Sequence, residues 1–209
     1  MDGTLTQTNE LIFDSFNHVA KKYLAKRLTP KEITGLFGPP EKECMINMLG
    51  GAQEIDQVMD YYYDFYQREH NTLASMYPGT IEILKYLKSR SVLIALFTGK
   101  GRHSTDITLE QFGITEYFDI TMTGDDVDEF KPSGNGIRKI MKNFSLYPEE
   151  VLTVGDAVGD FKASRETGVQ IASVVWDSYA KEEVIKLQSD FLFENVPDFF
   201  NWLKRIYSV

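Results

Sequence analysis

Apolar residues near the start of the chain recur with a helical period. From Asn9 onward they form one stripe on a helix of about four turns. The sequence TPKE at residues 29–32 begins a second helix, because it combines a capping box with proline in the first helical turn. Another long helical pattern covers residues 55–70. Residues 10–75 are therefore predicted to form a nearly all-helical unit.

The pattern changes to alternating helices and strands after residue 76. A helix at 80–89 leads into the apolar run SVLIALFT at 91–98, whose length and β-branching suit a strand buried on both faces. Gly113 and Gly168 are predicted to end two of the later helices. The remaining helices are predicted at 104–112, 133–144 and 159–167, and the remaining strands at 117–123, 150–156 and 169–176.

This order of elements predicts an α/β fold with a parallel sheet and helices on both faces. Because the helical unit comes early, it is expected to be an insertion after the first strand of the sheet. We therefore divide the chain into a Rossmann-like α/β core, residues 1–9 and 76–209, and a helical cap, residues 10–75.

Composition narrows the range of partners. The 209 residues carry a formal net charge of −9 at pH 7, which argues against a large surface for nucleic acid or anionic lipid. No apolar run approaches the roughly 20 residues needed to cross a bilayer, so we expect a cytoplasmic protein with no membrane partner. A small ligand is the better expectation, bound by a monomer or a homodimer. The single cysteine, Cys44, is interpreted as a buried structural thiol.

Four short polar motifs are expected to lie just beyond the ends of strands. In parallel sheets of this kind ligands bind beyond the carboxyl ends of the strands. The motifs are DGT at 2–4, FTGK at 97–100, FKP at 130–132 and GDAVGD at 155–160. Taken singly, each also fits an ordinary turn, helix cap or solvated loop. Their common position at strand ends favours a functional site.

The chemistry of these motifs is complementary. Asp156 and Asp160 flank a strand-to-helix turn and could present two carboxylates to a hard cation such as Mg²⁺. The Thr98 hydroxyl and the backbone around Gly99 offer donors to an oxyanion, and Lys131 adds a compact positive charge. Asp2 supplies a carboxylate able to exchange protons.

In this order the motifs resemble those of the haloacid dehalogenase superfamily, particularly the phosphoglycolate phosphatase-like and β-phosphoglucomutase-like members that carry a helical cap. The resemblance covers essentially the whole chain. It implies that Asp2 is the general acid and base, that Thr98 binds phosphate, and that Lys131 steadies the nucleophile and the transferring group. It also implies that Asp156 and Asp160 hold Mg²⁺.

Three further expectations follow from the same resemblance. Gly99 joins Thr98 and Lys131 in the phosphate-binding set, and Asp2 joins the two later aspartates in the metal set. Lys100 fits a T-x-K form of the second motif. An Asp at the position of Asp2 points towards phosphoryl transfer and away from the dehalogenases.

The sequence departs from the family pattern at its first motif, Asp-x-Asp-Gly-Thr, whose first Asp attacks phosphorus. Asp2, Gly3 and Thr4 match the second half of the motif, and only Met1 precedes them. We expect the natural gene product to continue upstream with a strand and this Asp; the alternative is a genuine short form without hydrolytic activity. Without that strand, the strands at 91–98 and 150–156 are expected to flank a gap.

The full-length form is therefore expected to be a Mg²⁺-dependent phosphatase of a small phosphorylated metabolite that works through an aspartyl phosphate. Two alternatives stay open. One is a phosphomutase of the β-phosphoglucomutase type, and the other is a catalytically silent protein that binds Mg²⁺ or a phosphometabolite.

Overall fold

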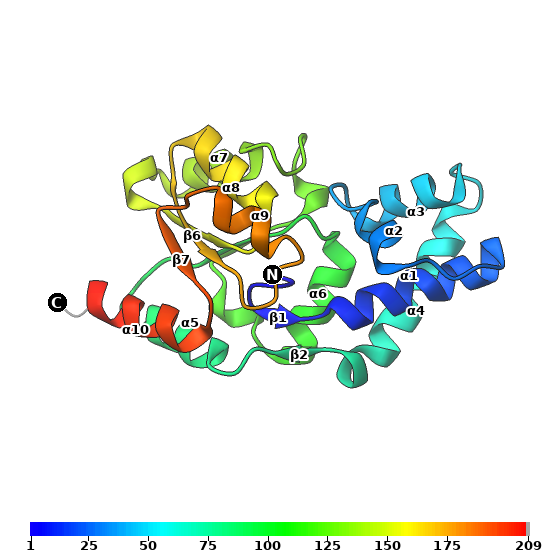
Figure 1. The fold of residues 1–209 in the computed structure, drawn as a ribbon, viewed down its shortest axis with the longest axis horizontal. Coiled ribbons are helices and arrows are strands. Elements are labelled where there is room, and N and C mark those ends of the chain that lie inside the picture. Colours follow the sequence, from blue (N-terminus) through cyan, green and yellow to red (C-terminus); the bar gives the residue numbers. More distant parts are fainter. Residues whose placement is uncertain (208–209) are drawn as a thin grey trace.

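The computed structural model describes residues 1–207, in which a unit of helices lies beside an α/β unit (Figure 1). Leu11, Phe16 and Val19 of the first helix are buried in one apolar cluster with Tyr62 and Tyr66 of the fourth. The cluster therefore confirms the predicted apolar stripe. The helical unit consists of α1 (Asn9–Leu24), α2 (Pro30–Thr34), α3 (Glu41–Leu49) and α4 (Ile55–Leu73).

The capping box predicted at the start of α2 is confirmed. The backbone N–H of Thr29 donates to Glu32 Oε2 at 2.7 Å, and the Glu32 N–H donates to Thr29 Oγ1 at 3.3 Å. Cys44 on α3 is buried as expected, and burial is the main reason that its thiol pKa rises to about 12. Its sulfur donates to the backbone oxygens of Leu36 and Pro39. The thiol therefore helps to fix the loop before α3.

The α/β unit alternates helices and strands in the predicted order. Its strands are β3 (Ala95–Phe97), β4 (Ile120–Met122), β5 (Leu152–Gly155), β6 (Gln170–Val174) and β7 (Phe191–Phe193). Its α-helices are α5 (Thr80–Ser89), α6 (Arg102–Phe112), α7 (Asn135–Phe144), α8 (Val158–Thr167), α9 (Lys181–Lys186) and α10 (Val196–Ile206). Short 3₁₀ turns are η1 (Thr115–Tyr117), η2 (Gly124–Asp126) and η3 (Pro148–Glu150).

Helix ends follow the sequence closely, whereas strand lengths do not. Gly113 and Gly168 end α6 and α8 in the left-handed conformation, with φ of 61° and 73°. The strand predicted at 91–98 is too long, because only Ala95–Phe97 is in the ladder. Before it, the Ile94 N–H donates to the Asp119 side chain at 2.8 Å instead of to a neighbouring strand.

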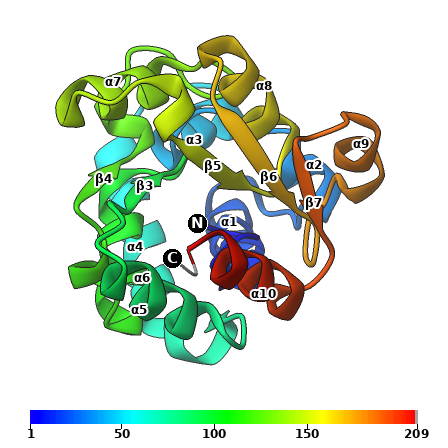
Figure 2. The ribbon, with the colours of Figure 1, turned by 90° about the vertical axis from the view of Figure 1, so that its left-hand side faces the viewer.

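The parallel sheet is split into two parts. β3 pairs with β4, while β5 pairs with β6 and β6 with β7, all in parallel. Within residues 1–207, no ladder joins β3 to β5. Figure 2 shows the two groups of strands on opposite sides of the α/β unit, with Met1 between them. The predicted gap between these strands is therefore confirmed.

A cavity of 490 Å³ occupies the gap. Leu96 and Val154 line it from the two facing strands, and Leu84 of α5 and Leu203 of α10 close it from the helices. Native interiors are close-packed, so the side chains and backbone edges around such a space lose contacts that a filled core would supply.

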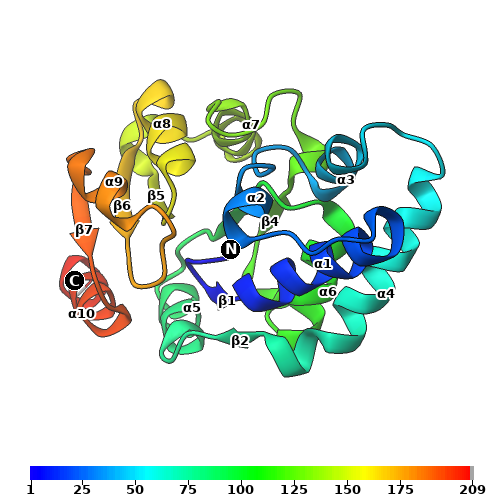
Figure 3. The same ribbon diagram turned by 45° about the vertical axis from the view of Figure 1, so that its right-hand side comes forward.

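The two units are joined by a short antiparallel ribbon. β1 (Thr6–Gln7) and β2 (Ser75–Met76) pair with Thr6 opposite Met76, and Figure 3 shows them side by side between the units. The division into a core of 1–9 and 76–209 and a cap of 10–75 stays a prediction. None of the helices within residues 1–207 combines the length and apolar character needed to span a bilayer.

The open edges of the split sheet should be visible in hydrogen exchange. We expect amides at 92–97 and 151–155 to exchange faster than those at 11–24, because one edge of each strand faces the cavity instead of a partner. Strand β6, paired on both sides, is the internal control. Equal protection of β3, β5 and β6, measured by mass spectrometry, would contradict this expectation.

Candidate active site

A second cavity, of 390 Å³, lies between the α/β unit and the helical unit. Residues that follow β3 and β5 line one side of it, and residues of α1, α3 and the loop before α3 line the other. The structure brings every predicted site residue to this cavity: Asp2, Thr98, Gly99, Lys131, Asp156 and Asp160.

Lys131 connects two sides of the cavity. Its Nζ donates to the Phe97 backbone oxygen at the end of β3, at 3.0 Å, and to Asp160 Oδ1 on α8, at 2.7 Å. Burial opposes ionisation of Asp160, but the charge and hydrogen bond of Lys131, together with the charge of the amino terminus, outweigh burial and lower the pKa of this carboxyl. Asp160 also accepts from the Ala157 N–H at 3.1 Å, which fixes it in the first turn of α8.

Asp156 has the opposite electrostatic environment. Burial first, and then repulsion from Asp160, raise its pKa to about 7. The Thr4 hydroxyl donates to Asp156 Oδ1 at 2.8 Å, so the carboxylate is oriented as well as buried. A cation beside Asp156 would remove the cost of ionising it.

The donor set suits a hard cation only in part. Asp156 supplies carboxylate oxygens of the kind that Mg²⁺ prefers, and its raised pKa shows that the nearby positive charges do not offset its burial and the repulsion from Asp160. Asp160, by contrast, is already paired with Lys131. Among the described residues, no group of three or more His, Cys, Asp or Glu side chains is positioned to hold a metal.

Thr98 is positioned by the end of β3. Its backbone N–H donates to the Met122 oxygen of β4 at 3.0 Å, and its Oγ1 accepts from the Lys100 N–H at 3.2 Å. Accepting that bond leaves the hydroxyl proton available to a ligand oxygen. The backbone of Gly99 passes close to the helical unit, since a Cβ there would lie 3.6 Å from the Gly38 oxygen.

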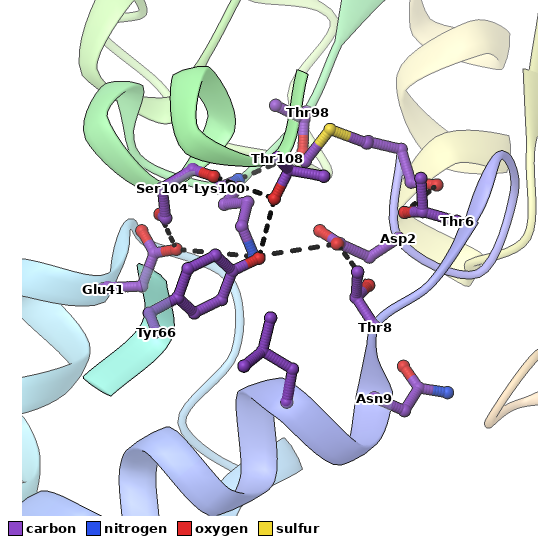
Figure 4. A network of polar contacts seen from close by, with 12 residues as sticks. Asp2, Thr6, Thr8, Asn9, Glu41, Tyr66, Thr98, Lys100, Ser104 and Thr108 are labelled. Carbon is purple, nitrogen blue, oxygen red and sulfur yellow. Dashed lines mark hydrogen bonds and ion pairs between the residues drawn. The ribbon is translucent and has the colours of Figure 1, made fainter. Parts of the chain in front are cut away.

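Asp2 belongs to a buried polar network shown in Figure 4. Its Oδ1 accepts from the Thr8 hydroxyl at 2.5 Å and lies 3.6 Å from Lys100 Nζ. Burial alone would raise the pKa of Asp2, but the charge of Lys100, the charge of the amino terminus and the bond from Thr8 together outweigh burial and lower it. Asp2 is therefore ionised at neutral pH.

Lys100 is almost inaccessible, with 3% of its side chain exposed. Its Nζ lies 4.7 Å from the centre of the Tyr66 ring of α4 and 3.8 Å from Glu41 Oε1 of α3. Burial would lower the pKa of Lys100, but Asp2, Tyr66 and Glu41 together outweigh burial and raise it. One buried cation therefore links Asp2 to two side chains of the helical unit.

Glu41 fastens the helical unit to the start of α6. Its Oε2 accepts from the Gly101 N–H at 2.6 Å, and its Oε1 accepts from the Ser104 hydroxyl at 2.5 Å. Only 8% of the Glu41 side chain is exposed. The approach is so close that a Cβ on Gly101 would lie 2.7 Å from Glu41 Oε2.

Comparison with known proteins identifies the family. The model of the family described as haloacid dehalogenase-like hydrolase matches residues 1–174. The chain belongs to the haloacid dehalogenase-like hydrolases. The resemblance of its motifs to this family is thereby confirmed.

Relatives of the hydrolase cover nearly its whole length. It is 28% identical to the pyrophosphatase PpaX of Anoxybacillus flavithermus over 203 residues, which is 97% of this chain and 94% of the relative. A crystal structure of a predicted phosphoglycolate phosphatase from Haemophilus somnus has a TM-score of 0.81 and 20% identity, over 99% of this chain and 95% of that one. CbbY from Rhodobacter sphaeroides, crystallised with phosphate, has a TM-score of 0.79 and 21% identity, over 92% and 90%.

Sequence reasoning missed the polar contacts made by Glu41 and underestimated Lys100. The segment GPPEKE gives only a break and restart of the chain, and nothing in it indicates that Glu41 faces the α/β unit. Lys100 was noted only as part of T-x-K, although a lysine directly after a buried strand and a predicted phosphate loop is a signal for an internal charge.

The raised pKa of Asp156 predicts how stability depends on pH. The folded state holds a proton on Asp156 that the unfolded chain releases near its ordinary pKa of 3.8. The contribution to the free energy of unfolding, on the order of a few kcal/mol, is therefore present below pH 4 and lost as pH rises towards about 7.

Thermal melts at pH 5 and pH 8, with and without Mg²⁺, test this dependence. We expect Mg²⁺ to raise the melting temperature more at pH 8, where Asp156 is ionised, and Asp156→Asn to abolish that difference. The exposed Asp56, changed to Asn, is the matched control. A Mg²⁺ effect that is equal at both pH values would argue against Asp156 as a cation ligand.

The contact between Glu41 and Gly101 can be measured with a double-mutant cycle. The φ of Gly101 is −68°, which alanine also adopts, so the cost of Gly101→Ala should come mainly from its methyl, which would lie 2.7 Å from Glu41 Oε2 and 3.3 Å from Asp125 Oδ2. We expect it to lower the free energy of unfolding by about 1–2 kcal/mol, and by less than about 0.5 kcal/mol in a Glu41→Ala background. Denaturant unfolding gives both values, and equal costs in the two backgrounds would contradict the contact.

Proposed function

We propose that this hydrolase is a Mg²⁺-dependent phosphatase whose substrate is a small phosphorylated metabolite. The observation that carries the proposal is the meeting of Asp2, Thr98, Lys131 and Asp156 at one cavity. An ionised carboxylate, a hydroxyl donor, a fixed ammonium and a carboxylate with a raised pKa are the groups that phosphoryl transfer uses. A relative named as a pyrophosphatase and a structural neighbour crystallised with phosphate support the same reaction class.

In the proposed mechanism the phosphoryl group lies beyond the end of β3. The Thr98 hydroxyl and the N–H of Gly99 donate to its oxygens, while Lys131 offsets part of its charge. The ligands for Mg²⁺ would be Asp156 with Asp160 in support, and the bound ion would neutralise negative charge on the transferring group. The further assignment of Asp2 to the metal site stays a prediction, because its carboxylate contacts Thr8 and Lys100.

Asp2 is proposed to move the protons of the reaction. In its protonated form Asp2 would give a proton to the leaving oxygen, and, ionised by that step, it would then accept a proton from the water that hydrolyses the aspartyl phosphate. Its lowered pKa favours the ionised form that the second step needs. Lys100 holds this carboxylate in place from the side of the helical unit. The helical unit itself forms one wall of the cavity.

The carboxylate that attacks phosphorus in the inferred aspartyl-phosphate mechanism would stand two positions before Asp2. Residues 1–209 contain no such carboxylate. We therefore infer that the polypeptide of residues 1–209 binds a phosphate group in its cavity but turns substrate over at background rates.

Both halves of this inference can be measured on the polypeptide of residues 1–209. In calorimetry with Mg²⁺, inorganic phosphate should bind, and Lys131→Ala should weaken binding by about tenfold or more, because a charged partner is lost. The exposed Lys181, changed to Ala, is the matched control. No phosphate binding at all would refute the proposed site.

Turnover is measured as the hydrolysis of p-nitrophenyl phosphate in the presence of Mg²⁺. We expect hydrolysis at the background rate, since Thr98, Lys131 and a metal cannot form an aspartyl phosphate by themselves. Robust hydrolysis that disappears on Asp2→Asn would show that Asp2 has been given the wrong role.

A further inference from the structure

The proposed chemistry leaves one wall of the 390 Å³ cavity without a role. This wall belongs to the helical unit and the loop before α3, and it faces the place where a leaving group would lie. The residues that form it are Asn9, Ile12, Phe16, Phe37, Gly38, Pro39, Glu41 and Cys44. Glu41 is the only charged side chain among them, and no lysine, arginine or histidine of the described helical unit lines the cavity.

The cations on the opposite wall are already paired. Lys131 lies 2.7 Å from Asp160, and Lys100 lies between Asp2, at 3.6 Å, and Glu41, at 3.8 Å. Lys100 therefore faces two carboxylates with a single positive charge. The amino group of Met1, which also lines the cavity, interacts with Asp2, Asp156 and Asp160. A bound Mg²⁺ would be used by the phosphoryl group, so among the described residues no lysine or arginine that lines the cavity is left for a second anionic group.

Glu41 is held as a fixed negative charge. The Gly101 N–H and the Ser104 hydroxyl both donate to it at the first turn of α6, and its side chain is nine-tenths buried. It cannot turn away from the cavity without leaving these buried donors unpaired, which is unfavourable. A ligand must therefore accommodate this carboxylate where it stands.

The rest of the wall suits an uncharged or aromatic group. Phe16 is buried beside the cavity, and Phe37 lies at its edge against Tyr179 of the α/β unit, with ring centres 6.4 Å apart. The space is of the size usual for small-molecule sites and far exceeds what a single phosphoryl group needs.

We propose that Glu41 restricts this hydrolase to phosphate monoesters whose leaving group is uncharged or cationic, and rejects substrates that carry a second anionic group. The inference rests on the proposed phosphatase function and adds the substrate class. It separates this chain from relatives named as pyrophosphatases, because pyrophosphate would place a second phosphoryl group against Glu41. A fixed carboxylate opposite an anion is a repulsive element of the kind that generates specificity.

Equilibrium binding to the polypeptide of residues 1–209 tests the proposal without requiring turnover. Four probes are compared by calorimetry with Mg²⁺: phenyl phosphate, phosphoethanolamine, 2-phosphoglycolate and pyrophosphate. We expect the first two, with an uncharged and a cationic leaving group, to bind at least about tenfold more tightly than the two that carry a second anion.

The variant Glu41→Gln keeps the shape of the side chain and its acceptor oxygen but removes the charge. We expect this variant to bind 2-phosphoglycolate and pyrophosphate about tenfold more tightly than the unaltered chain does. Its affinity for phenyl phosphate should change by less than about twofold. Glu43→Gln is the matched control, because this exposed residue of α3 carries the same charge but does not line the cavity. It should leave all four affinities unchanged.

The outcomes distinguish a failure of this proposal from a failure of the proposed phosphatase function on which it rests. If inorganic phosphate binds but 2-phosphoglycolate or pyrophosphate binds as tightly as phenyl phosphate, the phosphatase site stands and the role of Glu41 is refuted. An unchanged ratio of affinities in Glu41→Gln refutes it as well. If neither inorganic phosphate nor any ester binds, the proposed function fails and the substrate class fails with it. The comparison of the four probes on the unaltered chain tests the proposal even if the Glu41→Gln variant does not fold.

Discussion

The arrangement of the site depends on the two hydrogen bonds that the ammonium group of Lys131 donates. This group donates to the end of β3 and to Asp160 of α8, so it joins two parts of a sheet that no backbone ladder connects within residues 1–207. The same ion pair keeps Asp160 ionised and thereby raises the cost of ionising Asp156. One side chain therefore holds the spacing of the site and, together with the burial of Asp156, contributes to the unequal protonation of its two aspartates.

Local signals in the sequence were sufficient for most of the fold. The helix predicted at 80–89 is found as Thr80–Ser89, and the glycines at 113 and 168 end their helices as expected, because each of these depends on neighbouring residues only. The C-terminal β7 and α10 were not predicted. β7 has only three residues, too few to show a period, whereas α10 carries an overlooked cap in which Asn195 accepts from the Asp198 N–H.

The same distinction between local signals and long-range packing applies to the residues of the site. Residues in strand-end motifs could be placed together because the topology of a parallel sheet determines where strand ends meet. Glu41 could not, since its partners Gly101 and Ser104 lie about 60 positions away and the contact depends on how two packed units face each other. Desolvation also has no local signature, so the opposite pKa shifts of Asp156 and Asp160 became evident only from their surroundings.

The β1–β2 ribbon has a mechanical consequence. Both passages of the chain between the two units run through it, and their backbones are paired, with Thr6 opposite Met76 and Gln7 opposite Ser75. Because the two crossings are paired with each other, a hinge motion between the units would have to bend both of them together. Such a motion would part Glu41 from Gly101 and Phe37 from Tyr179 in one movement.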